Sequence, residues 1–368
     1  MTKTINVKLK NRSYKIIVRN DLLRAAGYWL RASSSSKKFL ILSVKSIFNR
    51  HGFNIEKGLR EIGATFKPIF IPDGEEQKKP EILMLILKKM AEFEMQRDSC
   101  LIAFGGGVVG DLGGFAASVY MRGIDFVQVP TTLLAQVDAS IGGKNGVDYK
   151  GIKNLIGTFF QPRAVLIDPQ VITTLSDRQY KTGLAEIIKY GVITDEKLFE
   201  KIENNIPLIL SRNTNVLNFL ISKSCEIKAK IVSWDEREGG IRAWLNYGHT
   251  LGHALEAYFK YKVLTHGEAV GYGMLFAAML SQRLGLCGPE VVSRQHRLLL
   301  RIGLLANLPR INREKVYEKM LLDKKVRDNR VQFILTRKIG LVTIQKNIPK
   351  NTVLSTLKNL QRKVASHP

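Results

Sequence analysis

The feature that most constrains the fold of this chain is a series of short, continuous apolar runs in its first half. The runs alternate with stretches of helical periodicity, and they cover residues 39–44, 68–72, 100–104, 126–130 and 164–168. Strands that are apolar on both faces and alternate with helices are typical of a parallel sheet covered by helices on both sides. The first part of the chain is therefore predicted to be an α/β domain with a parallel sheet.

The pattern changes after Leu175, where long segments with a period of 3.6 residues dominate to about residue 322. Only residues 331–342 again have the pattern of a strand or hairpin. We therefore expect two domains, an α/β nucleotide-binding domain at 1–174 and a mostly α-helical domain at 175–368. The longest charge-free stretch of the second domain, Ala269–Gln282, is too short to span a bilayer and is predicted to be a buried helix.

The composition is that of a globular protein with a strongly basic surface. With 368 residues, 45% of them hydrophobic, the chain can bury a large core. Its 57 Lys and Arg against 32 Asp and Glu give a formal charge of +25, which indicates affinity for an anion such as a phosphorylated small molecule, an acidic membrane or nucleic acid. The charge is scattered and no nucleic-acid recognition motif is present, so we expect a solvated basic surface and neither a nucleic-acid nor a membrane partner.

The cysteines and the N-terminal segment indicate a cytoplasmic protein. Cys100, Cys225 and Cys287 are odd in number and have no C-x-x-C spacing, so neither a disulfide framework nor a thiolate zinc site is expected. Residues 1–10 alternate polar and apolar side chains like a strand and lack the apolar region of a signal peptide.

Metal-ligand side chains occur in three segments of the second domain. His249 and His253 are four residues apart and would share one helix face, although such a pair alone is more often a coincidence. His266 adds an imidazole in a Gly-flanked turn, and Glu186 places a carboxylate among apolar neighbours, where a buried charge needs a partner. These ligand types favour a catalytic zinc site that leaves one position open for substrate.

A glycine-rich segment follows one of the predicted strands. Gly105–Gly110 fits the pattern G-x-G-x-x-G and opens a helix, so its backbone amides could approach a pyrophosphate. The acidic ribose-binding residue expected about 20 positions later is not evident after Val127. A tight strand-to-helix turn without a nucleotide therefore stays open as the alternative.

Another polar group follows the next predicted strand. Thr131 and Thr132 come directly after it, and Asp138 lies on a probable helix. Lys144, Lys153 and Asn154 form a cluster suited to a phosphate or a polyol. In a chain this basic, however, a lysine in a loop is expected even without a ligand. The spacing alone therefore does not decide whether these residues bind one.

Seven segments, in order and in register from about Asp73 to Lys325, make this sequence resemble the 3-dehydroquinate synthases. They are 105–111, 128–138, 184–191, 235–238, 246–253, 266–270 and 323–325. The resemblance implies an NAD-binding first domain and a metal- and substrate-binding second domain. It implies conversion of 3-deoxy-D-arabino-heptulosonate 7-phosphate to 3-dehydroquinate and phosphate in the shikimate pathway, with NAD used catalytically and Zn2+ or Co2+ bound.

The resemblance also implies roles for individual residues. Glu186, His249 and His266 would be the metal ligands, whereas His253, a fourth ligand by spacing alone, would contact substrate and assist proton transfer with Glu238. The other substrate positions would be Arg122, Asp138, Lys144, Asn154, Lys189, Lys228, Arg242, Asn246, and one or both of Lys324 and Lys325. Arg122 would reach the phosphate of a neighbouring subunit's substrate, which implies a homodimer.

For the cofactor, the resemblance implies four short segments and two further lysines. The residues are Asp73, Gly74, Glu75, Glu76, Gln77, Lys78, Gly106, Gly107, Val108, Val109, Gly110, Asp111, Thr131, Thr132, Lys144, Lys153, Val171, Ile172, Thr173 and Thr174.

The chain departs from the family pattern at a few positions. Ile152 stands where Gly usually precedes Lys-Asn, Asn145 and Gly146 replace a common Thr-Ala, and residues 77–80 are a loose version of the cofactor loop. The alternatives are another sugar-phosphate cyclase or a metal-dependent polyol dehydrogenase of the same fold. The many cationic candidates favour a phosphorylated, carboxylated substrate over a simple polyol.

Overall fold

The structure is a computed structural model that describes residues 2–305, 308–322 and 331–365. The chain forms two compact units, one made of the chain up to Leu175 together with Leu217–Arg237, the other of Ser176–Val216 and the chain from Glu238 onward. The chain thus leaves the first unit next to the boundary expected at 174 and then returns to it with most of helix α8 (Thr214–Trp234). The helical pattern of residues 214–234 does not predict this return.

The first unit is built on a mainly parallel sheet. Within the described residues the sheet has seven strands in the order β1-β2-β9-β6-β5-β3-β4. The five apolar runs form β3, β4, β5, β6 and β9, which are all parallel to their neighbours within this set, so the predicted fold class is confirmed. Two further strands extend one edge, β1 antiparallel to β2 and β2 parallel to β9. The strand bounds are β1 (Lys3–Val7), β2 (Tyr14–Val18), β3 (Lys38–Val44), β4 (Thr65–Ile71), β5 (Cys100–Gly105), β6 (Asp125–Pro130) and β9 (Ala164–Ile167).

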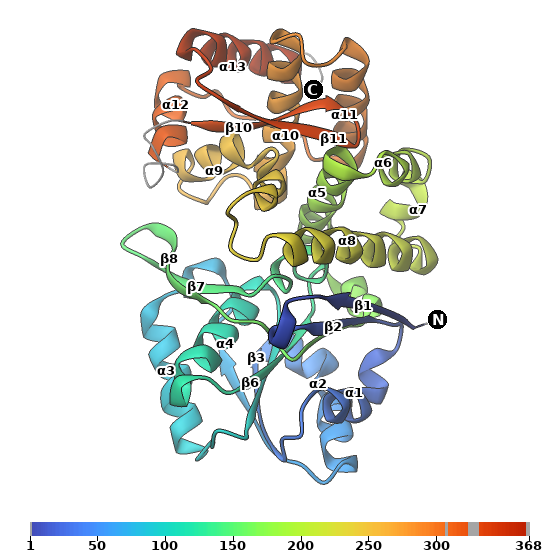
Figure 1. Ribbon diagram of the computed structural model, residues 1–368, viewed down its shortest axis with the longest axis vertical. Coiled ribbons are helices and arrows are strands. Elements are labelled where there is room, and N and C mark those ends of the chain that lie inside the picture. The colour runs from blue at the N-terminus through green and yellow to red at the C-terminus, as the bar shows by residue number, and fades with distance from the viewer. Residues whose placement is uncertain (1, 306–307, 323–330, 366–368) are drawn as a thin grey trace. The chain divides into compact units, whose positions relative to one another are not determined.

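Helices cover both faces of this sheet. Figure 1 shows α3 and α4 on one side of the strands, and α1 and α2 on the other. Glycine at 113 lets α4 lie close to β5, because a side chain there would press on Leu101 and Ala103. The bounds are α1 (Ala26–Ser33), α2 (Lys45–Glu61), α3 (Pro80–Glu92) and α4 (Gly107–Val119), with short 3-10 helices at Lys10–Arg12, Leu22–Ala25, Glu75–Gln77, Tyr120–Arg122 and Pro169–Thr174 and a π-helix at Ala135–Ala139.

A separate antiparallel hairpin, β7 (Lys144–Tyr149) and β8 (Ile152–Phe159), projects from the first unit (Figure 1). No strand is predicted here, because β8 is largely exposed and its side chains do not alternate between polar and apolar. At the base of the hairpin, Gly146 and Gly157 allow the two backbones to lie in close contact, since a side chain on either would overlap the opposite strand.

The second unit is mostly helical, as predicted. It contains α5 (Asp177–Thr194), α6 (Glu196–Glu203), α7 (Ile206–Leu210), a 3-10 helix (Ile241–Asn246), α9 (His249–Tyr258), α10 (His266–Arg283), α11 (Pro289–Ile302), α12 (Arg313–Leu322) and α13 (Lys350–Ala365). Residues 331–342, expected to form a strand or hairpin, belong to a hairpin that extends to residue 346, with β10 (Gln332–Lys338) paired with β11 (Leu341–Lys346). Ala269–Gln282 lies within α10, which is buried along most of its length. None of the helices in the described ranges is long and apolar enough to cross a membrane.

Candidate active site

One carboxylate and two imidazoles meet in the second unit. Glu186 lies on α5, and His249 and His266 are the first residues of α9 and α10. One oxygen of Glu186 lies 3.5 Å from Nε2 of His249 and 3.4 Å from Nε2 of His266. One potential ligand atom from each of the three residues lies within 4.8 Å of the others. The structure therefore brings together the three residues that the resemblance to the family implies as metal ligands.

Close helix packing is what brings these residues together. A side chain at Gly267 would overlap the backbone of Thr182, so glycine allows the start of α10 to lie against α5. A side chain at Gly273 would overlap the carbonyl of Gly248, the residue before α9, and Gly248 itself has a left-handed φ of +79°. These contacts bring the N-termini of α9 and α10 to the buried face of α5 that carries Glu186.

His266 differs from the prediction in its local structure. It was expected in a Gly-flanked turn, but it begins α10 after Thr265, which caps the helix. Thr265 and Glu268 form a reciprocal capping box, with the backbone N–H of each accepted by the side chain of the other. The cap fixes where the helix starts and thereby fixes the Cα of His266.

In both imidazoles, the Nδ1 atom contacts a neighbouring oxygen. Nδ1 of His249 lies 3.1 Å from the carbonyl oxygen of Tyr247, and Nδ1 of His266 lies 3.3 Å from a carboxylate oxygen of Glu256. Each contact leaves Nε2 directed at Glu186, which is the arrangement that metal-ligating histidines need. Glu256 was not predicted. Its only signal in the sequence is its spacing of seven residues from His249, which places both on one face of α9.

The charges in this cluster are buried. Glu186 is 0% exposed, and the ammonium of Lys189, one turn later on α5, contacts its carboxylate. Burial and the nearby Lys189 ammonium lower the pKa of His249 to about 3. Burial also disfavours the charged form of His266, but hydrogen bonds to Glu186 and Glu256 outweigh it and raise the pKa of His266 to about 10. A divalent cation at this site would therefore replace a proton on His266.

His253 lies beside the cluster. Its ring centroid is 5.2 Å from that of His249 and 6.2 Å from that of His266. His253, Glu256 and His266 form a second group whose potential ligand atoms lie within 4.8 Å of one another. The geometry alone therefore leaves His253 available either to a metal or to a substrate.

Three more of the predicted residues lie in the second unit. Asn246 donates from its amide nitrogen to a carboxylate oxygen of Glu238 at 2.8 Å. Arg242 lies on the 3-10 helix Ile241–Asn246 and is buried. The pair of Asn246 and Glu238 fixes the orientation of a carboxylate that could move a proton.

In the first unit the structure joins two predicted substrate residues. The ammonium of Lys228 donates to a carboxylate oxygen of Asp138 at 2.8 Å and to its backbone carbonyl at 2.6 Å. Lys228 lies on α8, so the return of this helix to the first unit is what places the lysine beside Asp138. Lys144 begins β7 and is exposed, whereas Asn154 lies on β8.

The glycine-rich segment has the geometry of a strand-to-helix turn at the carboxyl end of β5. Gly106 precedes the first residue of α4, and a side-chain carbon at Gly107 would make only an ordinary contact of 3.5 Å with Ala139. Gly107 is thus not required by packing within the chain. The backbone N–H of Thr131, at the end of β6, donates to Gly105 at 2.9 Å, and Thr132 caps the following turn by accepting from Ala135 at 3.1 Å.

The remaining predicted cofactor residues lie on two short helices and the hairpin. Glu75–Gln77 and Pro169–Thr174 are 3-10 helices, and Lys153 forms an ion pair of 3.4 Å with Glu75. Lys78 is buried and contacts the carboxylate of Asp111 on α4. The predicted residues Lys324 and Lys325 lie outside the described residues.

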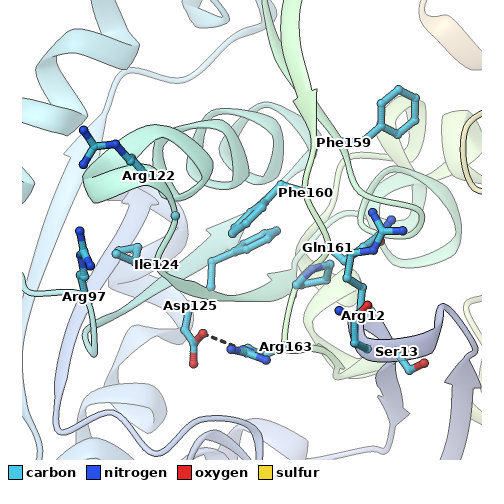
Figure 2. A pocket seen from close by; sticks show the side chains of 14 residues that line it. Arg12, Ser13, Arg97, Arg122, Ile124, Asp125, Phe159, Phe160, Gln161 and Arg163 are labelled. Carbon is cyan, nitrogen blue, oxygen red and sulfur yellow. Dashed lines mark hydrogen bonds and ion pairs between the residues drawn. The ribbon is translucent and has the colours of Figure 1, made fainter.

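Arg122 lines a cavity of about 400 Å³ in the first unit (Figure 2). Four arginines contribute to it, namely Arg12, Arg97, Arg122 and Arg163. Arg163 is paired with Asp125 at 2.6 Å, and Arg12 with Glu236 at 2.8 Å. Figure 2 shows Arg97 and Arg122 on one side of the cavity. The lining is suited to an anion.

Solved structures define the class of protein to which this fold belongs. The 2-epi-5-epi-valiolone synthase of Streptomyces hygroscopicus, solved with NAD+ and Zn2+ bound, is 27% identical, with a TM-score of 0.89 over 96% of this chain and 98% of that one. A 2-deoxy-scyllo-inosose synthase complexed with carbaglucose-6-phosphate, NAD+ and Co2+ has the same fold, with a TM-score of 0.88 over 98% and 100% of the two chains at 24% identity. The chain therefore has the fold of the sugar-phosphate cyclases.

The sequence comparisons identify the family within that class. The profile of the 3-dehydroquinate synthase N-terminal domain matches residues 68–182, and that of its C-terminal domain matches 183–326. A 3-dehydroquinate synthase from a Synechococcus species is 43% identical over 97% of this chain and 98% of its own length. Another, from Pelobacter propionicus, is 44% identical over 91% and 94% of the two chains. The chain belongs to the 3-dehydroquinate synthase family.

Proposed function

We propose that this protein converts 3-deoxy-D-arabino-heptulosonate 7-phosphate to 3-dehydroquinate and phosphate, as a carbon–oxygen lyase that depends on NAD and a divalent metal. The observation that carries the proposal is the buried cluster of Glu186, His249 and His266 in a chain of this family. The relatives of nearly equal length that are named 3-dehydroquinate synthase support the same activity.

The residues present fit a divalent zinc or cobalt ion. Glu186 supplies a buried carboxylate oxygen, and His249 and His266 supply nitrogens whose opposite ring positions are already engaged. An O,N,N set of this kind leaves a position open for substrate oxygens. The glycine-rich turn before α4 fits a dinucleotide, because Gly107 has no packing role in the chain and leaves the helix N-terminus accessible. When bound, the metal would supply Lewis acidity and the dinucleotide would supply reversible hydride transfer.

The other residues divide into anion binders and proton carriers. In the first unit, Asp138 holds the ammonium of Lys228. The same carboxylate could accept a hydrogen bond from a substrate hydroxyl. In the second unit, Arg242 and Lys189 are buried cations suited to a carboxylate or a phosphate. His253 and Glu238 are the groups that could move protons during the loss of phosphate and the ring closure.

One assay tests the proposal directly. The purified protein is incubated with the heptulosonate phosphate, a catalytic amount of NAD and zinc, and both phosphate and 3-dehydroquinate are measured. We expect equal amounts of the two products and no net NADH, because the hydroxyl that is oxidised is reduced again before release. Accumulation of NADH would indicate a dehydrogenase, and phosphate release without dehydroquinate would indicate a different cyclase.

The resemblance of the chain to its family also supports a homodimer in the cytoplasm. In this proposal Arg122, on the wall of the cavity in Figure 2, contacts the phosphate bound to the partner subunit. Sedimentation of the purified protein would test the dimer. Mixing an Arg122→Ala subunit with a subunit inactivated at the metal cluster would test the sharing of a site. If Arg122 acts on the partner's substrate, both defects of the mixed dimer fall in one site and the other site stays intact, so activity returns; if Arg122 acts within its own subunit, neither site is intact.

A further inference from the structure

One buried lysine joins the cofactor loop to the β7–β8 hairpin. Lys78 follows the 3-10 helix Glu75–Gln77 and is 5% exposed. Its ammonium contacts the carboxylate of Asp111 on α4 and donates to the side-chain oxygen of Asn154 on β8. A single cation therefore links three segments of the first unit that are far apart in the sequence.

Backbone contacts strengthen the same link. The N–H of Asp148 donates to the carbonyl of Lys78 at 2.7 Å, and the N–H of Asn154 donates to the carboxylate of Asp148 at 2.8 Å. Asn154 has a φ of +52°, a left-handed conformation that Asn adopts more readily than most residues. Both the side chain and the backbone of Asn154 are therefore held, directly or through Asp148, by Lys78.

Apolar packing contributes little to the outer part of this hairpin. Ile152 is 55% exposed and Leu155 is 52% exposed, so neither side chain removes much apolar surface from water. The ion pair of Lys153 with Glu75 is partly exposed on both sides, and exposed pairs of this kind stabilise weakly. β7 is packed into the core through Val147, whereas β8 is held at Asn154 by the buried ammonium of Lys78.

The charge on Lys78 is favoured by its surroundings. Burial alone would lower its pKa, but the carboxylates of Asp111 and Glu75 outweigh burial, and the pKa of Lys78 is raised. The lysine remains an ammonium, and a charged donor forms stronger hydrogen bonds than a neutral one.

We propose that Lys78 is a positioning residue that holds Asn154 in place relative to α4 and so couples cofactor binding at Asp111 to substrate binding at Asn154. The inference rests on the proposed function, which supplies the roles of Asp111 and Asn154. Because its ammonium is committed to these two side chains, Lys78 acts through them.

Steady-state kinetics test the proposal with three variants. Lys78→Met removes the ammonium and keeps an apolar stem, Lys78→Arg keeps a charge, and Lys88→Met is the control because Lys88 is an exposed lysine of α3 outside the proposed sites. We expect the KM for the heptulosonate phosphate to rise roughly 10-fold to 100-fold in Lys78→Met, since hydrogen bonds to a charged group are lost. Lys78→Arg should recover part of the loss, and Lys88→Met should leave KM unchanged.

A double variant separates positioning from general stability. If Lys78 acts through Asn154, the KM of Lys78→Met/Asn154→Ala should be no higher than that of the worse single variant, because both changes remove one interaction. If the two effects multiply, the proposal is wrong.

Hydrogen exchange over residues 144–159 gives a readout that does not require turnover. We expect NAD to slow exchange in the unaltered protein, and we expect Lys78→Met to exchange faster and to lose the response to NAD, with Lys88→Met unchanged. Unaltered exchange in a folded Lys78→Met protein would overturn the proposal. If Lys78→Met does not fold, Asn154→Ala must show the same loss of protection for the proposal to stand. If the expected exchange pattern is observed but the protein has no synthase turnover, the proposed function is wrong and the positioning role of Lys78 stands.

Discussion

The buried pair of Glu186 and Lys189 predicts how the metal cluster responds when its carboxylate is neutralised. Glu186→Gln keeps the shape of the side chain but removes its charge, which leaves the ammonium of Lys189 buried at 1% exposure without its carboxylate partner. Breaking a buried pair on one side costs about 3–5 kcal/mol of unfolding free energy, because an uncompensated charge remains. Removing both charges with Glu186→Gln/Lys189→Met should restore most of that stability, since the pair itself contributes little net energy.

The measurement is denaturant unfolding of protein freed of metal with a chelator, alongside zinc analysis of protein reloaded with metal. We expect Glu186→Gln to lose about 3–5 kcal/mol of unfolding free energy and to bind no zinc. We expect the double variant to recover most of the unfolding free energy but still to bind no zinc. The Lys189→Met single variant is the control for zinc binding, because it leaves the carboxylate and both imidazoles in place. In the metal-free protein it should also lose stability, because the buried carboxylate of Glu186 then lacks the Lys189 ammonium. A double variant as unstable as Glu186→Gln would refute the role of charge burial, and full zinc occupancy in Glu186→Gln would refute the ligand assignment.

Three further predictions concern the same residues. His253→Ala should keep zinc and NAD and lose about 100-fold to 10,000-fold in kcat, whereas a zinc-free variant would make His253 a ligand. Gly107→Val should fold, because only Ala139 lies near, at 3.5 Å, yet bind NAD far more weakly by isothermal titration; unchanged affinity in a folded protein would rule out the glycine turn as the pyrophosphate site. Because the pKa of His266 is raised to about 10, zinc binding at pH 7 should release a proton, and titrations in two buffers of different ionisation enthalpy should show it. Identical apparent enthalpies in both buffers would show that His266 is already neutral.

The strands of the parallel sheet could be predicted because burial on both faces leaves a continuous apolar run in the sequence. Phe39 to Leu42 are fully buried, and no polar residue interrupts them. The β7–β8 hairpin carries no such signal, since β8 is largely exposed and Asn154 is held by a polar contact with Lys78. Helix α8 has an ordinary helical pattern, and that pattern does not specify which unit the helix joins.

The candidate site could be predicted only in part for a similar reason. Ligand types and the resemblance to the family identify Glu186, His249 and His266, but the contact between Glu256 and His266 depends on how α9 packs against α10. A glutamate in the third turn of a helix is indistinguishable in the sequence from a solvent-facing one. Its burial in the structure is what reveals its role in orienting the imidazole.

The position of each histidine along its helix distinguishes His249 from His253, which their spacing alone makes equivalent as metal ligands. His249 and His266 are the first residues of α9 and α10, where unpaired backbone N–H groups create a positive potential. An oxygen of the buried Glu186 carboxylate lies 3.5 Å from Nε2 of His249 and 3.4 Å from Nε2 of His266, so the first residues of both helices meet at one carboxylate. His253 is one turn further along α9 and has no such position. Helix N-termini favour anions, so the two that begin at these histidines would favour an anionic substrate such as the phosphorylated keto acid of the proposed reaction.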